Sequence, residues 1–201
     1  MERVVIMGHS LGALIGLAFA ALYPDRVDRI ILLDGGGKLT KKQTEKVFAG
    51  IEPTLDRLGK VFPSKRAYLD LMKANPLLQP WTPSLETFYS YELEVVEGGV
   101  RSRVNPEHIR EERENLGSFD VEECYAKVEC PAFILRATEG MSTPDSILLP
   151  EEALERMLRR IPDSRHMDIK GSNHYSIVLH PNEQRDRAIR SFIENEIPGH
   201  G

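Results

Sequence analysis

The chain has 201 residues, of which 41% are apolar and 28% are charged, as is usual for one globular domain or for a core with a small inserted lobe. The net charge is −5, and the 26 basic residues are interspersed with 31 acidic ones, which argues against nucleic-acid binding. No apolar stretch is long enough for a bilayer and no secretory leader is recognisable, so we expect a cytoplasmic protein without a membrane contact. Two cysteines, Cys124 and Cys130, are expected to be reduced thiols.

Short unbroken apolar runs predict the strands of a parallel sheet. The first three runs, in chain order, are residues 4–7, 30–33 and 132–135, and a weaker fourth run covers 166–169. None of the three stronger runs shows the alternation of apolar and polar residues that is typical of a strand with one solvent-exposed face. We therefore expect about four parallel strands, buried on both faces.

Helical periodicity lies between these runs. The stretch 11–22 predicts a helix, and Pro24 follows its end. A second helix is expected after Pro150, with acids in its first turn and bases in its last, and a third from about Asn182. The apolar face expected for the first helix consists of Leu11, Leu14, Ile15, Ala18 and Leu22.

One long segment interrupts the alternation of strands and helices. Residues 37–128 have a helical or irregular pattern with many Pro and Gly breakers, and they are too many for a simple connection. We predict an α/β core formed by 1–36 and 129–201, with helices on both faces of the sheet, and an inserted helical cap or lid at 37–128.

Gly8-His9-Ser10-Leu11-Gly12 fits the pattern G-x-S-x-G. It directly follows a predicted strand and directly precedes a predicted helix, the context in which this pattern forms a nucleophile elbow. Glycines at 8 and 12 would let neighbouring backbone pass close to the bend. The Ser10 hydroxyl is then the predicted nucleophile, and the backbone amide of Leu11 is a predicted oxyanion donor.

A serine hydroxyl needs a base near neutral pH. His174 lies in Gly171-Ser172-Asn173-His174-Tyr175, just after the fourth predicted strand, where a loop would bring it over the same sheet edge. His174 is therefore the predicted base.

These segments, together with the strand ending Leu33-Asp34-Gly35 and the run 130–137, resemble a cap-bearing α/β-hydrolase from its nucleophile strand onward. The resemblance implies a Ser-acid-His site, an acyl-enzyme mechanism and a small ester-like substrate, with no cofactor and no metal. Members usually place the acid after the strand assigned to 132–136, which favours Asp145. Asp34, at the end of the second strand, and Glu139, nearer the strand end, are the alternatives.

The resemblance predicts hydrolysis of a carboxylic ester or related acyl bond. Cleavage of a carbon–carbon, lactone or thioester bond and a non-catalytic binding or interaction fragment are the alternatives. Similar hydrolases carry further strands and an oxyanion loop before the nucleophile strand, so we expect a truncated chain. A four-strand sheet would expose an edge beside the first strand, which predicts low activity of this fragment and self-association through that edge.

Overall fold

The computed structural model describes residues 2–116, 119–141, 143–144 and 146–194. The chain divides into two compact units, which we call the sheet unit (1–47 with 120–201) and the inserted unit (48–119). Each unit is described by itself below.

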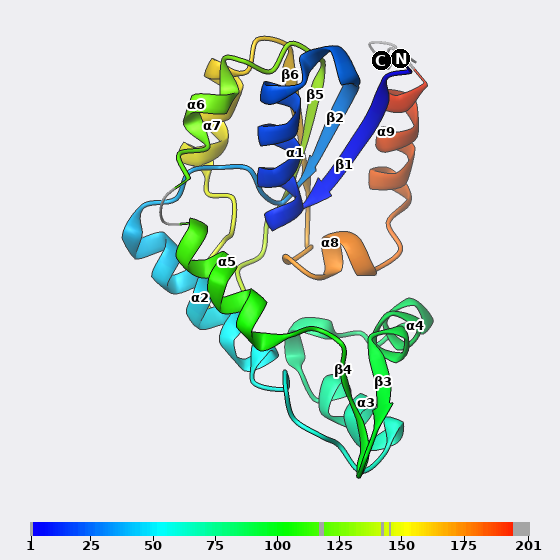
Figure 1. Cartoon of the computed structure of the whole chain (residues 1–201). Helices are drawn as coiled ribbons and strands as arrows, with labels where there is room; N and C mark the ends of the chain where they lie inside the picture. Colours follow the sequence, from blue (N-terminus) through cyan, green and yellow to red (C-terminus); the bar gives the residue numbers. More distant parts are fainter. Residues whose placement is uncertain (1, 117–118, 142, 145, 195–201) are drawn as a thin grey trace. The chain divides into compact units, whose positions relative to one another are not determined.

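The sheet unit contains four parallel strands in the order β1-β2-β5-β6 (Figure 1). They are β1 (Val4–His9), β2 (Val27–Leu33), β5 (Ala132–Ala137) and β6 (Ser164–Ile169), and each contains one of the predicted apolar runs. The register sets Leu33 of β2 beside both His9 of β1 and Leu135 of β5. The carboxyl ends of these three strands therefore meet at one edge, and the predicted α/β sheet is confirmed.

Helices cover both faces of this sheet (Figure 1). On one face, α1 (Leu11–Leu22), α6 (Glu122–Tyr125) and α7 (Glu151–Arg160) form a core with Ile30 and Leu32 of β2. On the other, α8 (Ser176–Leu179) and α9 (Glu183–Ile193) pack on Ile31 and Leu33. Alternate side chains of β2 thus enter two different cores, which explains why its sequence is apolar without alternation.

The predicted apolar face of α1 is only partly right. Leu14 and Ala18 are half-buried against the core, whereas Ile15 and Leu22 are exposed. The fully buried residues of the helix are Ala13, Gly16, Leu17 and Ala20. Every residue of α1 is apolar or glycine, so periodicity could not select the face. The small residues lie against the sheet because they allow close approach: a Cβ at Gly16 would lie 3.2 Å from the side chains of Ile6 and Ile30.

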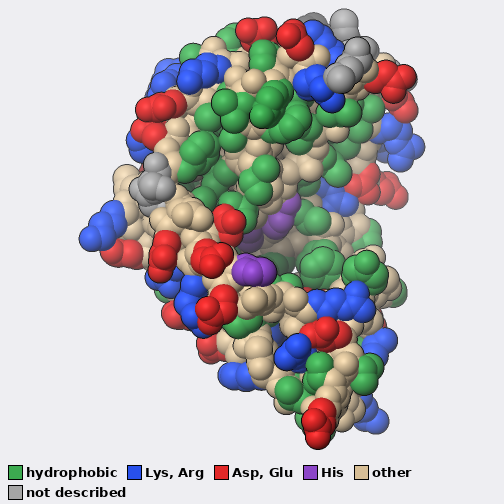
Figure 2. All heavy atoms as spheres, viewed as in Figure 1, with side chains coloured by type: hydrophobic (Ala, Val, Ile, Leu, Met, Phe, Trp, Pro, Cys, Tyr) green, Lys and Arg blue, Asp and Glu red, His purple; other side chains and the backbone are tan. Residues whose placement is uncertain are grey.

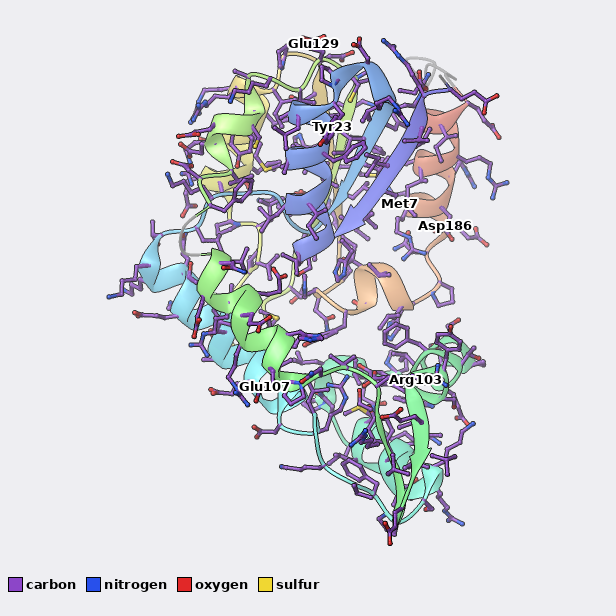
Figure 3. The ribbon with its side chains drawn as sticks, in the orientation of Figure 1. Met7, Tyr23, Arg103, Glu107, Glu129 and Asp186 are labelled. Atoms are coloured by element: carbon purple, nitrogen blue, oxygen red, sulfur yellow. The ribbon has the colours of Figure 1, made fainter. Side chains whose placement is uncertain are left out.

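Strand β1 forms one edge of the described sheet, since it pairs only with β2 among the described residues. Hydrophobic side chains gather on the visible face over β1 and α1 (Figure 2), where Met7 and Tyr23 are labelled (Figure 3). Such a patch is unusual for a soluble monomer. Self-association through this edge stays a prediction. The exposed apolar side chains here are Val4, Val5, Met7, Ile15, Phe19, Leu22 and Tyr23.

The inserted unit contains a β-hairpin that the sequence reading missed. Strands β3 (Leu93–Val96) and β4 (Gly99–Ser102) pair antiparallel. Gly98 and Gly99 have positive φ angles of 84° and 145°, and a Cβ at Gly99 would lie 1.9 Å from the carbonyl oxygen of Phe62. The Gly-Gly pair between short β-rich runs was the available signal.

Helices make up most of the remaining inserted unit. They are α3 (Lys65–Lys73), α4 (Pro83–Tyr91), α5 (Pro106–Leu116) and the part of α2 (Lys41–Leu55) that lies beyond residue 47, together with the short 3₁₀ turn Pro76–Leu78.

The compact inserted unit is shorter than the predicted insertion 37–128. Residues 121–128 pack in the core of the sheet unit, where Val121 and Tyr125 are buried and the Tyr125 hydroxyl donates to the carbonyl of Gly36 at 2.7 Å. That the inserted unit acts as a lid stays a prediction. Within the described part of the chain, every helix is too short or too polar to cross a bilayer.

Candidate active site

Ser10 lies between the end of β1 and the start of α1, and its backbone is strained. Its backbone has φ 55° and ψ −118°, a combination that a residue with a side chain adopts only at a free-energy cost. The Ser10 N–H donates to the carbonyl of Leu33 at 3.1 Å, which ties the bend to the end of β2. The predicted strand-to-helix turn is therefore present at the carboxyl edge of the sheet.

Glycine is required at two positions around this bend. A Cβ at Gly8 would lie 2.2 Å from the carbonyl oxygen of Gly12, and a Cβ at Gly35 would lie 2.6 Å from that of Ser10. Gly12 differs from the expectation, because a Cβ there would meet no atom within 4 Å. The close approach therefore involves the backbone of residue 12, and Gly35 is a participant that the motif did not reveal.

The Ser10 hydroxyl does not cap the helix that it precedes. Serine is favoured at this position because its oxygen normally accepts a hydrogen bond from the first helical turn. Ser10 makes no such side-chain bond. Leu11 is the first residue of α1, where backbone N–H groups lack an acceptor within the helix. Helix capping thus does not explain the serine, and the residue that follows it carries a backbone donor at the N-terminus of α1.

His174 and Asp34 form a buried pair. Nδ1 of His174 donates to Oδ2 of Asp34 at 2.8 Å, and the two residues are 4% and 1% exposed. A carboxylate can only accept, so Nδ1 carries the proton. In the neutral ring Nε2 then holds the lone pair, and it makes no hydrogen bond to another described residue. This is the tautomer that a general base requires.

The fold holds Asp34 at both of its carboxylate oxygens. Asp34 follows β2 with φ 43°, and its N–H donates to Leu135 of β5 at 2.7 Å. Its Oδ1 accepts from the N–H of Ala137 at 3.1 Å while Oδ2 accepts from His174. Two backbone contacts to β5 thus leave the second oxygen directed at the imidazole.

The loop that carries His174 is also fixed locally. Gly171 turns the chain after β6 with φ 70°, and the Ser172 hydroxyl donates back to Ile169 at 2.6 Å. The side-chain oxygen of Asn173 accepts from the N–H groups of Tyr175 and Ser176, both at 2.9 Å. The predicted loop therefore does bring His174 to the sheet edge.

Of the other two candidate acids, the structure describes Glu139. Glu139 is exposed, its backbone N–H donates to the carbonyl of Ser172 at 2.9 Å, and no hydrogen bond joins it to His174 among the described residues. Asp145 lies outside the described residues, so its role stays a prediction. The structure contains a hydrogen bond between His174 and Asp34, one of the two alternative acids expected from the sequence.

His9 completes the cluster beside Ser10. Its Nε2 donates to the backbone carbonyl of His174 at 2.9 Å, and the two rings stack with centroids 4.4 Å apart. Burial and the neighbouring His174 lower the pKa of His9 from 6.5 to about 4, so the His9 ring is neutral near pH 7. Sequence reasoning had placed His9 in the elbow without a role.

His9 precedes Ser10 and Asp34 follows β2, and both residues contact His174. No hydrogen bond joins the Ser10 hydroxyl to His174 among the described residues. Catalytic hydrogen bonds are often long in a free enzyme and shorten when substrate binds. Chemically, these residues offer a serine hydroxyl, an imidazole that is hydrogen-bonded to a carboxylate, and a helix N-terminus.

Comparisons with known proteins identify the family and the fold of the chain. A family model described as "alpha/beta hydrolase fold" matches residues 1–181. A serine hydrolase-like protein from Danio rerio is 24% identical over 98% of this chain and 62% of its own length. A 2-(acetamidomethylene)succinate hydrolase from Mesorhizobium japonicum is 26% identical over 96% of this chain and 64% of its own length.

A similar fold occurs among solved structures. The crystal structure of an E-2-(acetamidomethylene)succinate hydrolase has a TM-score of 0.77 and 21% identity, covering 96% of this chain and 67% of that one. The chain thus spans a little under two thirds of the curated relatives it matches.

Proposed function

The chain belongs to the alpha/beta hydrolase fold family, and we propose that it is a serine hydrolase that cleaves a carboxylic ester or a related acyl bond. The observation that carries the proposal is the buried hydrogen bond between His174 and Asp34, at the strand ends beside the strained Ser10. A histidine in this tautomer next to a serine that does not cap its helix is the arrangement that nucleophilic catalysis needs.

In the proposed reaction, Oγ of Ser10 attacks the carbonyl carbon of the substrate while Nε2 of His174 removes the hydroxyl proton. The backbone N–H of Leu11 stabilises the negative oxygen of the tetrahedral intermediate. The carbon–leaving-group bond then breaks as His174 returns its proton to the leaving group. Water attacks the acyl-enzyme by the same steps, releasing the acid and restoring Ser10.

Asp34 has a positioning and electrostatic role in this scheme. It holds Nδ1 of His174 and stabilises the imidazolium that forms while the proton is on the ring. Its burial matters because the attraction between the carboxylate and the imidazolium is weakened little by water. Asp145 and Glu139 have no part in the scheme.

The substrate is proposed only as a class. The relatives' names support a hydrolase, and two of the similar proteins are named for hydrolysis of 2-(acetamidomethylene)succinate. A panel of small activated esters, a thioester, a lactone and that amide-containing dicarboxylate would therefore separate the chemistries that a Ser-Asp-His site can perform.

The test is covalent labelling of the full chain by a fluorophosphonate, together with turnover of a small activated ester. We expect labelling at Ser10, and complete loss of labelling and turnover in Ser10→Ala. Ser84→Ala is the matched control, because Ser84 is exposed on α4. Labelling that persists in Ser10→Ala would remove Ser10 as the nucleophile.

A non-catalytic binding protein on the same scaffold is the alternative. It predicts no labelling of Ser10 in a chain that is folded by an independent measure, such as a cooperative thermal transition.

A further inference from the structure

His9 holds His174 through two separate contacts. The first is the hydrogen bond from its Nε2 to the backbone carbonyl of His174, 2.9 Å long. The second is the ring stack, with centroids 4.4 Å apart and an angle of 30° between the planes. Because a carbonyl oxygen can only accept, the hydrogen bond requires a proton on Nε2 of His9.

The contact with Asp34 alone does not fix the imidazole. A single hydrogen bond at Nδ1 holds only one edge of the ring, so small changes of the side-chain torsions can still pivot it. Such a pivot would displace Nε2, and displacements of about 1 Å can lower a rate about 100-fold. The flat face of the His9 ring opposes the pivot, while its Nε2 ties the loop that carries His174.

We propose that His9 is a positioning residue that keeps Nε2 of His174 directed at Ser10. The inference rests on the proposed function, since it takes His174 as the base. His9 itself does not contact the reacting atoms. It acts from the residue before the nucleophile, so the same bend that strains Ser10 also places the ring that orients its base.

The charge of His9 is part of this role. The titratable groups that face it are His174 and Asp34, and burial with the proximity of His174 lowers its pKa to about 4. His9 is therefore neutral when His174 takes the proton from Ser10. A cation at position 9 would instead repel the imidazolium that forms on His174 during the proposed reaction.

Two substitutions separate the two contacts. His9→Phe keeps an aromatic face but removes the N–H donor, whereas His9→Gln keeps a donor but removes the stacked ring. We expect each to slow fluorophosphonate labelling of Ser10 about tenfold at pH 7. His166→Gln is the control, since His166 is an exposed histidine on β6.

The measurement is the labelling rate at pH 7 of variants that show a cooperative thermal transition. A purely structural role of His9 would lower the folded fraction without changing the labelling rate of the folded chain.

The Nδ1–H resonance of His174 in the NMR spectrum gives a readout independent of reactivity. We expect it to be sharp in the unmodified chain and broadened by exchange with water in His9→Phe and His9→Gln. An unchanged resonance and unchanged labelling in both variants would overturn the positioning role while leaving Ser10 as nucleophile. Absence of labelling in the unmodified chain would contradict the proposed function instead, and the resonance would still decide the role of His9.

Discussion

Each compact unit contains a buried carboxylate with a nitrogen partner, but the partners differ in chemistry. In the sheet unit, Asp34 accepts from His174 at 2.8 Å. In the inserted unit, Glu92 accepts from Arg57 at 2.7 Å, with both side chains less than 10% exposed. The imidazole can exchange its proton near neutral pH, whereas the guanidinium is always charged.

Three side chains donate hydrogen bonds to the carboxylate of Glu92. Its Oε1 accepts from Arg57, from the Tyr68 hydroxyl at 2.8 Å and from the Ser102 hydroxyl at 2.5 Å. Arg57 also donates to Tyr68 at 2.7 Å and to the carbonyl of Thr54. Burial raises the pKa of Tyr68, so its hydroxyl keeps the proton that it donates to Glu92. This network joins α3 to the ends of α2 and the hairpin.

The difference shows how a candidate catalytic pair can be distinguished from a structural ion pair. A buried ion pair such as Arg57–Glu92, in which both groups make further hydrogen bonds to the protein, holds elements together. A buried pair that leaves one nitrogen of an imidazole without a described partner, at the strand ends where the Ser10 backbone bends, is the arrangement on which the proposed proton transfer depends. Burial of a charge alone would not distinguish Glu92 from Asp34.

Of the substitutions that test this difference between the two pairs, Asp34→Asn is expected to have the largest effect. An amide can donate to Nδ1 of His174, which would place the ring proton on Nε2 and remove the base. We expect the rate of ester turnover to fall about 10⁴-fold, with the fold retained. The measurement is kcat on the small activated ester at pH 7.

Asp145→Asn and Glu139→Gln are the controls for the acid, and both should retain activity near that of the unmodified chain. A 10⁴-fold loss in Asp145→Asn with an active Asp34→Asn would return the role of the acid to Asp145.

The next largest effect concerns stability rather than turnover. Glu92→Ala leaves the charge of Arg57 buried without its partner, which should lower the free energy of unfolding by about 3–5 kcal/mol. The matched control is Glu94→Ala in the same hairpin, whose pair with Arg101 is exposed and should contribute about 1 kcal/mol or less.

Urea unfolding of the two variants measures this difference. If Glu92→Ala were as stable as Glu94→Ala, the buried network would not be the scaffold of the inserted unit.

The smallest expected effect is a pH dependence specific to the sheet unit. The pKa of His9 is about 4 in the folded chain, against an ordinary value of 6.5. Between these values the unfolded chain binds more protons, so stability falls as the pH drops from 6.5 to 4, by at most about 3 kcal/mol. His9→Gln should flatten this part of the stability curve.

Urea unfolding at pH 7 and pH 4.5 checks the slope, with His166→Gln as the control that should keep it. An equal slope in His9→Gln and the unmodified chain would mean that other groups cause the acid sensitivity.

Local patterns in the sequence were sufficient for the sheet and for the bend. The apolar runs of β2 and β5 are continuous because both faces of these strands meet a core, and this signal needs no knowledge of distant contacts. The edge strands β1 and β6 are more exposed than the expected doubly buried strands. The elbow at Ser10 is likewise a short-range feature: a strand, two glycines and a helix within a few residues predict the strained turn.

Other features required the tertiary structure. The buried face of α1 could not be predicted, because the helix is apolar on all sides and the close approach of the sheet selected its small residues. The contact of Asp34 with His174 was equally hidden, since the two residues are 140 positions apart. Only the pairing of β2 with β5, and of β5 with β6, brings their following loops together.

The sequence by itself thus determined that a serine stands in a strained bend at the end of a parallel strand, because bond geometry and local sterics act within a few residues. Which carboxylate contacts the histidine, and that a second histidine stacks on it, was decided by strand order, which no local pattern encodes.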